Sequence, residues 1–296
     1  MTTRSRAEAA LLATTLIWGG TFAVVKIGMR DVSPILLIAI RFLLGGGLLL
    51  ALFGRRLFPI PGQALLKGSI LAAFLFLGFV TQNIGLTITT ASKSAFITGM
   101  MVIFVPLLQV VIERRPPRLG NVLGVGIVAL GLWFLTSPDG ESFNAGDALT
   151  LLCSVLFAVY IVYLDVISKE MTTEQLVIIQ MVCTGLMAAA STALFETPRF
   201  VPSTRAVASL VYLTLLATVV TTYVQTRFQK ETTPTRAVVI FSIEPVIATV
   251  IAYVLLGETL GALGVLGGAL IVAGVLVSEF AESIPFLRRN GEPADS

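Results

Sequence analysis

Histidine is absent from the chain of 296 residues, and cysteine is present only as Cys153 and Cys183. Without histidine the chain has neither the commonest metal ligand nor the side chain that usually carries protons near neutral pH. Each cysteine lies inside an apolar run with no second ligand motif beside it, so we interpret both as packing residues. These absences exclude imidazole chemistry, and they predict neither a metal site nor a cofactor.

Charged residues are scarce as well, at 12% of the chain, where soluble domains carry about 25%. Hydrophobic residues make up 56% of the chain. That surplus is too large for one core of this length, so a lipid bilayer is expected to solvate much of the surface.

The net charge of +3 comes from basic residues in short, scattered clusters. Because they form no stripe, we expect no nucleic-acid partner, and anionic lipid headgroups account better for the basic excess.

Long apolar runs dominate what is present. A membrane helix needs about 20 mainly apolar residues, and clusters of charge, Pro and Gly mark the breaks. The expected spans are 7–29, 33–54, 66–89, 92–112, 119–137, 145–166, 173–195, 205–228, 233–256 and 260–280. The gaps between them are too short for a soluble domain. The sequence therefore predicts an all-α membrane protein with ten transmembrane helices.

Lysine and arginine are unevenly shared between the two sides of these spans. Most of the 20 basic residues fall on the side of the N-terminus, and the other side receives only Arg30, Lys93, Arg199 and Arg205. The positive-inside rule then places both termini in the cytoplasm, with 281–296 as a cytoplasmic tail, in a cell inner (plasma) membrane.

The two halves of the chain resemble each other. One constant shift superposes Gln82 on Gln225, Thr90 on Thr233, Lys93 on Arg236, Gly124 on Gly267, and Gly131 on Gly274. Five spans per half is an odd number, so the repeats 1–137 and 145–280 are predicted to be inverted in the membrane, with substrate bound between them near the midplane.

Several short motifs resemble the EamA branch of the drug/metabolite transporter superfamily, in order and across nearly the whole chain. They are Trp18-Gly19-Gly20-Thr21-Phe22 through Lys26, Pro34 with Arg41-Phe42, Thr90-Ala91-Ser92, Glu244-Pro245, Gly257-Glu258-Thr259-Leu260, and Gly264, Gly267 and Gly274. The resemblance implies a ten-helix inverted-repeat exporter of amino acids, related metabolites or drugs. It also implies no nucleotide-hydrolysing domain, in agreement with the absence of a GxxxxGK[ST] phosphate loop.

Two prolines inside expected spans predict helix kinks, because proline removes a backbone donor and frees the carbonyl one turn earlier. They are Pro106 and Pro245. The repeat would put the partner of Pro245 at Val102, so the two halves are expected to bend at different depths.

Glu244 lies about midway along the span 233–256, directly before Pro245. An ionisable group inside a membrane helix usually faces a cavity or a partner. We therefore expect Glu244 to line the substrate cavity, where it binds a substrate ammonium group, carries a coupling proton, or pairs with a buried base.

Arg41, within the span 33–54, is the second charged candidate for the cavity. It is expected to grip a carboxylate through two hydrogen bonds. The alternatives are a pair with Glu244 or extension toward the headgroups.

Gln82 and Gln225 occupy equivalent places in the two halves, and Asn83 adjoins the first of them. Their amides are expected to offer donors and acceptors to a solute in the cavity. The alternative is hydrogen bonding between helices, worth about 0.6 kcal/mol on average.

Two aromatic pairs complete the candidate cavity. Trp18 and Phe22 are one turn apart, and Tyr160 and Tyr163 are three residues apart, so each pair shares a helix face. Such faces line either a cavity that tolerates aromatic solutes or the lipid interface.

Small-residue spacing marks the spans 119–137 and 260–280. Gly120 and Gly124, and likewise Gly264 and Gly268, have the GxxxG spacing that lets helix backbones approach closely. These glycines are expected to pack within the bundle or to form a homodimer face.

The function that these features favour is a secondary transporter that exports small metabolites such as amino acids by alternating access, with a coupled proton as one option. An uptake carrier of the same fold is the alternative within transport. An enzyme is disfavoured because no catalytic cluster occurs, and a sensor or scaffold because no soluble output domain fits in the loops.

The predicted topology can be tested with reporter fusions placed after Ser296 and within residues 138–144. The two fusions should report opposite sides of the membrane, because five spans separate the second segment from each end. Activity of both reporters on one side would contradict the ten-span arrangement.

Overall fold

The computed structural model describes residues 3–56, 59–113, 119–136 and 143–280. Over these residues the chain is helical, apart from connecting segments and one isolated bridge between Val32 and Phe200. The described helical runs long and apolar enough to cross a membrane number eight: Arg4–Gly28, Pro34–Phe53, Gly62–Leu86, Ala91–Gln109, Ala145–Ile167, Thr173–Phe195, Thr204–Glu231 and Pro234–Leu256. The all-α membrane class is therefore confirmed. The other two expected spans contain shorter apolar helices, Leu123–Leu135 and Ala262–Gly274.

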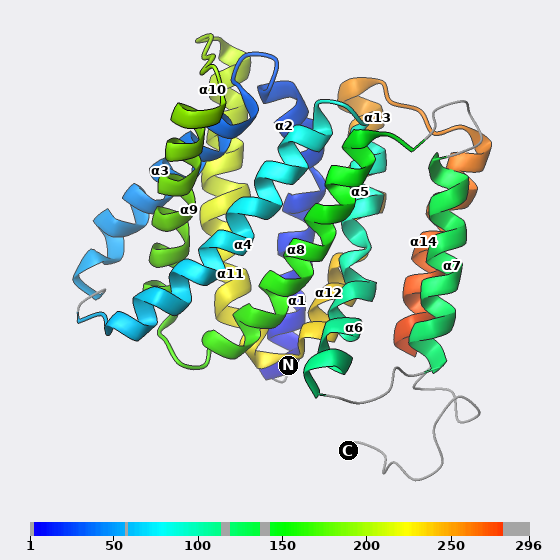
Figure 1. Cartoon of the computed structure of the whole chain (residues 1–296), viewed down its shortest axis with the longest axis horizontal. Helices are drawn as coiled ribbons and strands as arrows, with labels where there is room; N and C mark the ends of the chain where they lie inside the picture. Colours follow the sequence, from blue (N-terminus) through cyan, green and yellow to red (C-terminus); the bar gives the residue numbers. More distant parts are fainter. Residues whose placement is uncertain (1–2, 57–58, 114–118, 137–142, 281–296) are drawn as a thin grey trace.

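Figure 1 shows these helices as one bundle, with α1 beginning near its lower end and α2, α10 and α13 near its upper end. The α-helices are α1 Thr3–Gly19, α2 Thr21–Gly28, α3 Pro34–Phe53, α4 Gly62–Leu86, α5 Ala91–Gly99, α6 Met101–Glu113, α7 Leu119–Thr136, α8 Ala145–Ile167, α9 Thr173–Phe195, α10 Thr204–Val211, α11 Thr221–Phe228, α12 Pro234–Phe241, α13 Glu244–Leu256 and α14 Ala262–Phe280. A π-helix, Tyr212–Val220, joins α10 to α11, and short 3₁₀ turns cover Gly54–Arg56 and Gln229–Glu231.

Three of the spans are interrupted near their middle. The breaks fall at Gly20 between α1 and α2, at Met100 between α5 and α6, and at Ser242–Ile243 between α12 and α13. Met100 and Ile243 are related by the same shift that superposes Gln82 on Gln225.

The helices that precede these two related breaks also begin alike. The Thr90 side chain accepts a hydrogen bond from the Lys93 N–H at the start of α5, and the Thr233 side chain accepts one from the Arg236 N–H at the start of α12. A threonine at this position supplies a partner to a helical N–H that would otherwise lack one. The matched residues Thr90 and Thr233 therefore have the same role, which is to cap the N-terminus of a helix.

The two prolines occupy different places relative to the breaks. Pro245 lies in the first turn of α13, where a backbone N–H would have no helical partner, so proline is tolerated there. The break in this span falls just before it, at Ser242–Ile243. Pro106 lies inside α6, which continues through it, while the break falls earlier at Met100.

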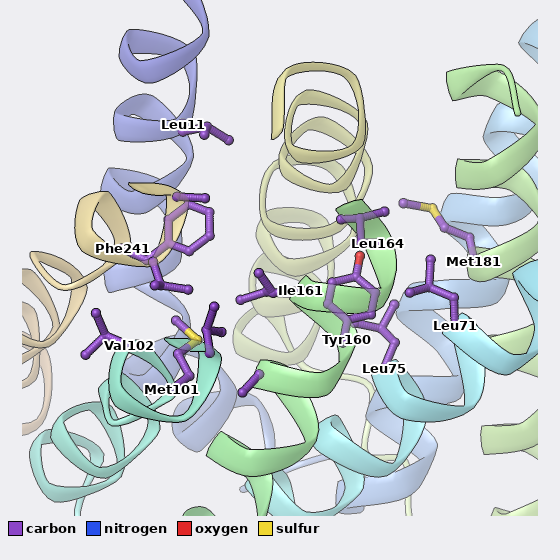
Figure 2. Close-up of a cluster of buried hydrophobic side chains, with 14 of the residues drawn as sticks. Leu11, Leu71, Leu75, Met101, Val102, Tyr160, Ile161, Leu164, Met181 and Phe241 are labelled. Atoms are coloured by element: carbon purple, nitrogen blue, oxygen red, sulfur yellow. The ribbon is translucent and has the colours of Figure 1, made fainter. Parts of the chain in front are cut away.

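The apolar core surrounds the middle of the bundle. Its larger cluster joins side chains from most of the spans, and Figure 2 shows Met101 and Phe241 on one side of Ile161, with Tyr160 and Leu75 on the other. A second cluster, around Phe22, lies among α2, α3, α10 and α13. The interrupted helices thus end among closely packed side chains.

Helices α7 and α14 pack along each other at one edge of the bundle (Figure 1). Glycine makes this approach possible, because a Cβ on Gly267 would lie 2.5 Å from the backbone nitrogen of Leu135, and one on Gly274 would lie 2.8 Å from the carbonyl oxygen of Gly124. Gly268 instead faces the ring of Phe96. These described glycines therefore pack inside the molecule, whereas Gly120 lies outside the part whose packing is described.

Replacing Gly267 by Ala should lower the free energy of unfolding in detergent by about 1–3 kcal/mol, because the added methyl group meets backbone that cannot rotate away. Gly126→Ala in α7 is the matched control, since nothing lies within 4 Å of a Cβ there. Alanine has a higher helix propensity than glycine, so this variant should have the same free energy of unfolding as the parent or a slightly higher one. Equal thermal unfolding of the two variants would contradict the close α7–α14 contact.

Candidate functional site

A cavity of about 70 Å³ lies inside the bundle, at the depth where the spans are interrupted. The side chains around it come from both halves of the chain. They are Trp18, Thr21, Arg41, Leu75, Phe79, Gln82, Thr98, Met101, Phe157, Tyr160, Ile161, Gln225, Phe241 and Glu244. Charged, amide and aromatic groups therefore share one small space.

Most of the residues expected in the cavity from the sequence line it in the structure. These are Trp18, Arg41, Gln82, Tyr160, Gln225 and Glu244.

Three of the expected residues lie elsewhere. Phe22 is buried in the second apolar cluster, Asn83 is fully buried and donates to the Pro34 carbonyl at 3.0 Å, and Tyr163 packs against the main core outside the cavity lining. Asn83 follows Gln82 by about 100° around the helix, so the two amides face different neighbours. Tyr163 lies three residues beyond Tyr160 on the same helix, α8, which is nearly one turn away.

Arg41 is 1% exposed, and its side chain reaches the cavity from α3. Its Nε donates to the Thr218 hydroxyl at 2.8 Å, and its guanidinium lies over the rings of Phe42 and Phe79, at 5.1 and 4.6 Å from their centroids. Ring faces attract a cation but leave its net charge in place. Arg41 therefore keeps its positive charge deep in the bundle, away from the headgroups.

Glu244 is the first residue of α13 and is 8% exposed. Among the described residues it has no hydrogen-bond or ion-pair partner, and neither Arg41 nor Lys26 lies within 4 Å of its carboxylate. Lys26 instead pairs with Glu258 at 3.2 Å. The expected alternative of an ion pair between Glu244 and Arg41 is thus not formed in this conformation, and Lys26 forms no such pair either, because other groups hold both bases.

A set of buried amides holds the polar wall of the cavity. The Tyr160 hydroxyl donates to Gln180 Oε1 at 2.9 Å, and Gln180 Nε2 donates to the Thr226 hydroxyl at 3.1 Å. Gln225 Nε2 donates to Gln229 Oε1 at 3.0 Å. Sequence reasoning missed Gln180, although a glutamine inside an apolar span is a visible signal.

Aromatic rings form the apolar wall. Trp18 and Phe241 meet edge to face with centroids 5.2 Å apart, and Phe79 meets Phe157 in the same way at 5.3 Å. Such contacts fix ring orientation. Trp18 was expected in the cavity from the sequence, but nothing in the sequence distinguishes Phe79, Phe157 and Phe241 from the other phenylalanines.

The lower end of the bundle has a wider and more polar opening. This depression of about 600 Å³ is bordered by Lys169, Glu170, Met171, Thr172, Thr173, Glu174, Gln175, Tyr223, Arg227, Lys230 and Glu231. Tyr223 borders the depression and Gln225, two residues on, lines the cavity.

The eight described helical runs long and apolar enough to cross a membrane, together with the small cavity among them, define a multi-pass membrane protein with an internal cavity. The chain belongs to the EamA-like transporter family, whose family model matches residues 5–137 and 144–280. It is therefore a transporter and not an enzyme, and its partners are a solute and the lipid bilayer.

The curated relatives are transporters as well. An uncharacterized transporter of Archaeoglobus fulgidus is 30% identical over 277 residues, which are 93% of this chain and 86% of the relative. The uncharacterized inner membrane transporter YedA of Escherichia coli is 27% identical, over 91% of this chain and 89% of the relative. A solved crystal structure with 20% identity has a TM-score of 0.71 and covers 94% of this chain and 97% of its own, so it shares the fold.

Because Glu244 has no hydrogen-bond or ion-pair partner among the described residues, Glu244→Gln should leave the thermal unfolding temperature unchanged or raise it. Asp147→Asn is the matched control, since Asp147 is also buried but accepts hydrogen bonds from Thr89 and from the Asn144 backbone. Asparagine keeps only one accepting oxygen, so one of these two bonds is lost, at a cost of about 1 kcal/mol. A loss of stability in Glu244→Gln as large as that in Asp147→Asn would show that Glu244 is held by a structural partner.

Proposed function

We propose that this protein is a secondary transporter that exports small zwitterionic metabolites, such as amino acids, by alternating access. The observation that carries the proposal is the presence of a basic and an acidic side chain in one cavity. Arg41 and Glu244 both line it, and neither is neutralised by an oppositely charged side chain among the described residues. A solute carboxylate at Arg41 and a solute ammonium group at Glu244 would satisfy both.

The aromatic and amide groups support the same class of solute. The rings of Trp18, Phe79 and Phe157 give an apolar surface to the solute side chain, while Gln82 and Gln225 give it hydrogen-bonding groups. A cavity of about 70 Å³ holds roughly two waters. The bundle must therefore widen to take a metabolite, and the interruptions in its spans supply places for such movement.

The related halves support ten helices arranged as two inverted repeats, 1–137 and 145–280. The threonine caps at Thr90 and Thr233 and the breaks at Met100 and Ile243 recur at the same shift along the chain. Exchange of the conformations of two such halves would turn a cavity open at one end into a cavity open at the other.

The lower end of the bundle is proposed to face the cytoplasm, and the membrane to be the inner (plasma) membrane. Basic residues gather at that end, as the positive-inside rule requires. The open depression lies there too, so solute would arrive from the cytoplasm, in agreement with export. Residues 281–296 would then be a cytoplasmic tail.

Solute counterflow in liposomes tests the proposal. An amino acid that carries both charges should exchange, whereas the matching amine and carboxylic acid, each with one charge, should exchange at least about 10-fold more slowly, because one buried charge stays unpaired. Equal exchange of all three compounds would contradict a zwitterion site. Radiolabelled efflux and uptake in the same cells then separate an exporter from an uptake carrier.

Glu244→Gln separates the two proposed roles of this carboxylate. If Glu244 carries a coupling proton, the variant should lose pH-driven flux and keep solute exchange, and if it binds the ammonium group, it should lose both. Glu8→Gln, at an exposed ion pair, is the control and should transport normally. Normal pH-driven flux in Glu244→Gln would overturn a transport role for this residue.

A further inference from the structure

Three short helices connect the cavity with the upper end of the bundle (Figure 1). Helix α2 begins at the cavity residue Thr21, α5 reaches the cavity at Thr98, and α13 begins at Glu244. The three helices also pack against one another. Each is separated from the lower part of its span by one of the breaks, so together they form a compact upper segment of the bundle.

A single carboxylate joins the three helices at their upper ends. Glu258, just beyond α13, accepts hydrogen bonds from the backbone N–H groups of Ala91 and Ser92 in the first turn of α5, both at 3.0 Å. The same carboxylate binds Nζ of Lys26 on α2 at 3.2 Å. Lys26 Nζ also donates to the Thr89 carbonyl at 2.8 Å. Helix N-termini favour a negative charge, so these contacts reinforce one another.

The end of α13 sets the position of Glu258. Gly257 has a φ of 68°, in the left-handed region that glycine adopts without strain. The Glu258 N–H then donates back to the Ala252 carbonyl at 3.3 Å. This helix-ending turn directs the chain across to α5.

The Glu258 carboxylate is held in its charged form. Burial alone would raise its pKa, but the hydrogen bonds from Ala91 and Ser92 and the charge of Lys26 outweigh burial and lower the pKa below its ordinary value. The contacts therefore persist across the neutral pH range.

A second glutamate at the same end, Glu196, also accepts hydrogen bonds from a helix N-terminus, but the helices that it joins are unbroken. Glu196 accepts hydrogen bonds from the Ser33 hydroxyl at 2.8 Å and from the Ile35 and Leu36 N–H groups at 3.0 Å each. It follows α9 and caps α3, and both of these helices run unbroken past the cavity depth. Glu196 thus joins whole spans, whereas Glu258 joins half-spans.

We propose that α2, α5 and α13 form the gate at the upper end of the transport path, and that Glu258 is the latch that keeps it closed. The gate moves about the breaks at Gly20, Met100 and Ser242–Ile243, and the cavity opens upward when the contacts of Glu258 are released. This inference rests on alternating access in the proposed function. Glu258 does not line the cavity, so its proposed role is to position the three helices and not to bind the solute.

Thiol labelling tests the latch. Leu75 lines the cavity from the unbroken helix α4, so Leu75→Cys, in a background with Cys153→Ala and Cys183→Ser, reports opening of the cavity. A membrane-impermeant, positively charged methanethiosulfonate reagent is added to intact cells and, separately, to inside-out vesicles. Glu258→Gln should raise the labelling rate from the Glu258 side by about 10-fold, because it removes charge-assisted bonds that only the closed gate makes.

Glu196→Gln is the matched control and should leave that labelling rate within about twofold of the parent, since it frees no half-span. Lys26→Met, which keeps the helix-end bonds, should give a smaller increase than Glu258→Gln, and it serves as the second variant if Glu258→Gln folds poorly. Labelling that is unchanged in both, or raised equally by Glu196→Gln, would overturn the latch. Counterflow is measured on the same preparations to distinguish failure of the latch from failure of the proposed transport function. Normal counterflow with unchanged labelling refutes the latch alone.

Discussion

The constraint on which this structure depends is that a charge buried in an apolar bundle must be neutralised, and the cost of leaving it alone is several kcal/mol. At the upper end the acids meet this constraint. The side chains of Arg205 and then Ser203 donate to Asp31 and lower its pKa to about 2. Glu196 and Glu258 accept from helix N-termini. At the cavity, Glu244 and Arg41 have no such partners among the described residues. We therefore propose the middle of the bundle as the place where a solute supplies the missing partners.

An interrupted helix explains how Glu244 comes to the middle of the bundle, whereas Arg41 lies on the unbroken helix α3. A continuous span would carry its polar ends only at the two membrane surfaces, whereas a break sets a helix start at mid-depth, as at Glu244. The breaks also divide the bundle into upper and lower segments that can shift without unfolding. The proposed binding and gating would both follow from one backbone feature, with Glu244 at one end of α13 and Glu258 just past the other.

The sequence predicted those features that depend on local pattern. Apolar length located the eight membrane-length helical runs that the structure describes. The repeat matched Thr90 with Thr233, which both cap helices, because capping needs only a side-chain oxygen three residues before an N–H. Features that depend on distant packing were not predictable. The pairing of Lys26 with Glu258 joins residues at opposite ends of the chain. Phe79 and Phe157 line the cavity only because of how α4 meets α8, and no periodicity in an almost wholly apolar helix indicates which face turns inward.

The proposed binding of a zwitterion between Arg41 and Glu244 can be followed with one of the chain's own fluorophores. The chain has two tryptophans: Trp18 lines the cavity, and Trp133 is 65% exposed on α7. In a Trp133→Phe variant, titration with a transported amino acid should change the Trp18 emission until the change saturates. Adding the matching amine or carboxylic acid should not reduce that change, because neither compound should displace the amino acid. Unchanged emission at saturating amino acid, in a preparation that still performs counterflow, would place the solute elsewhere and contradict the account.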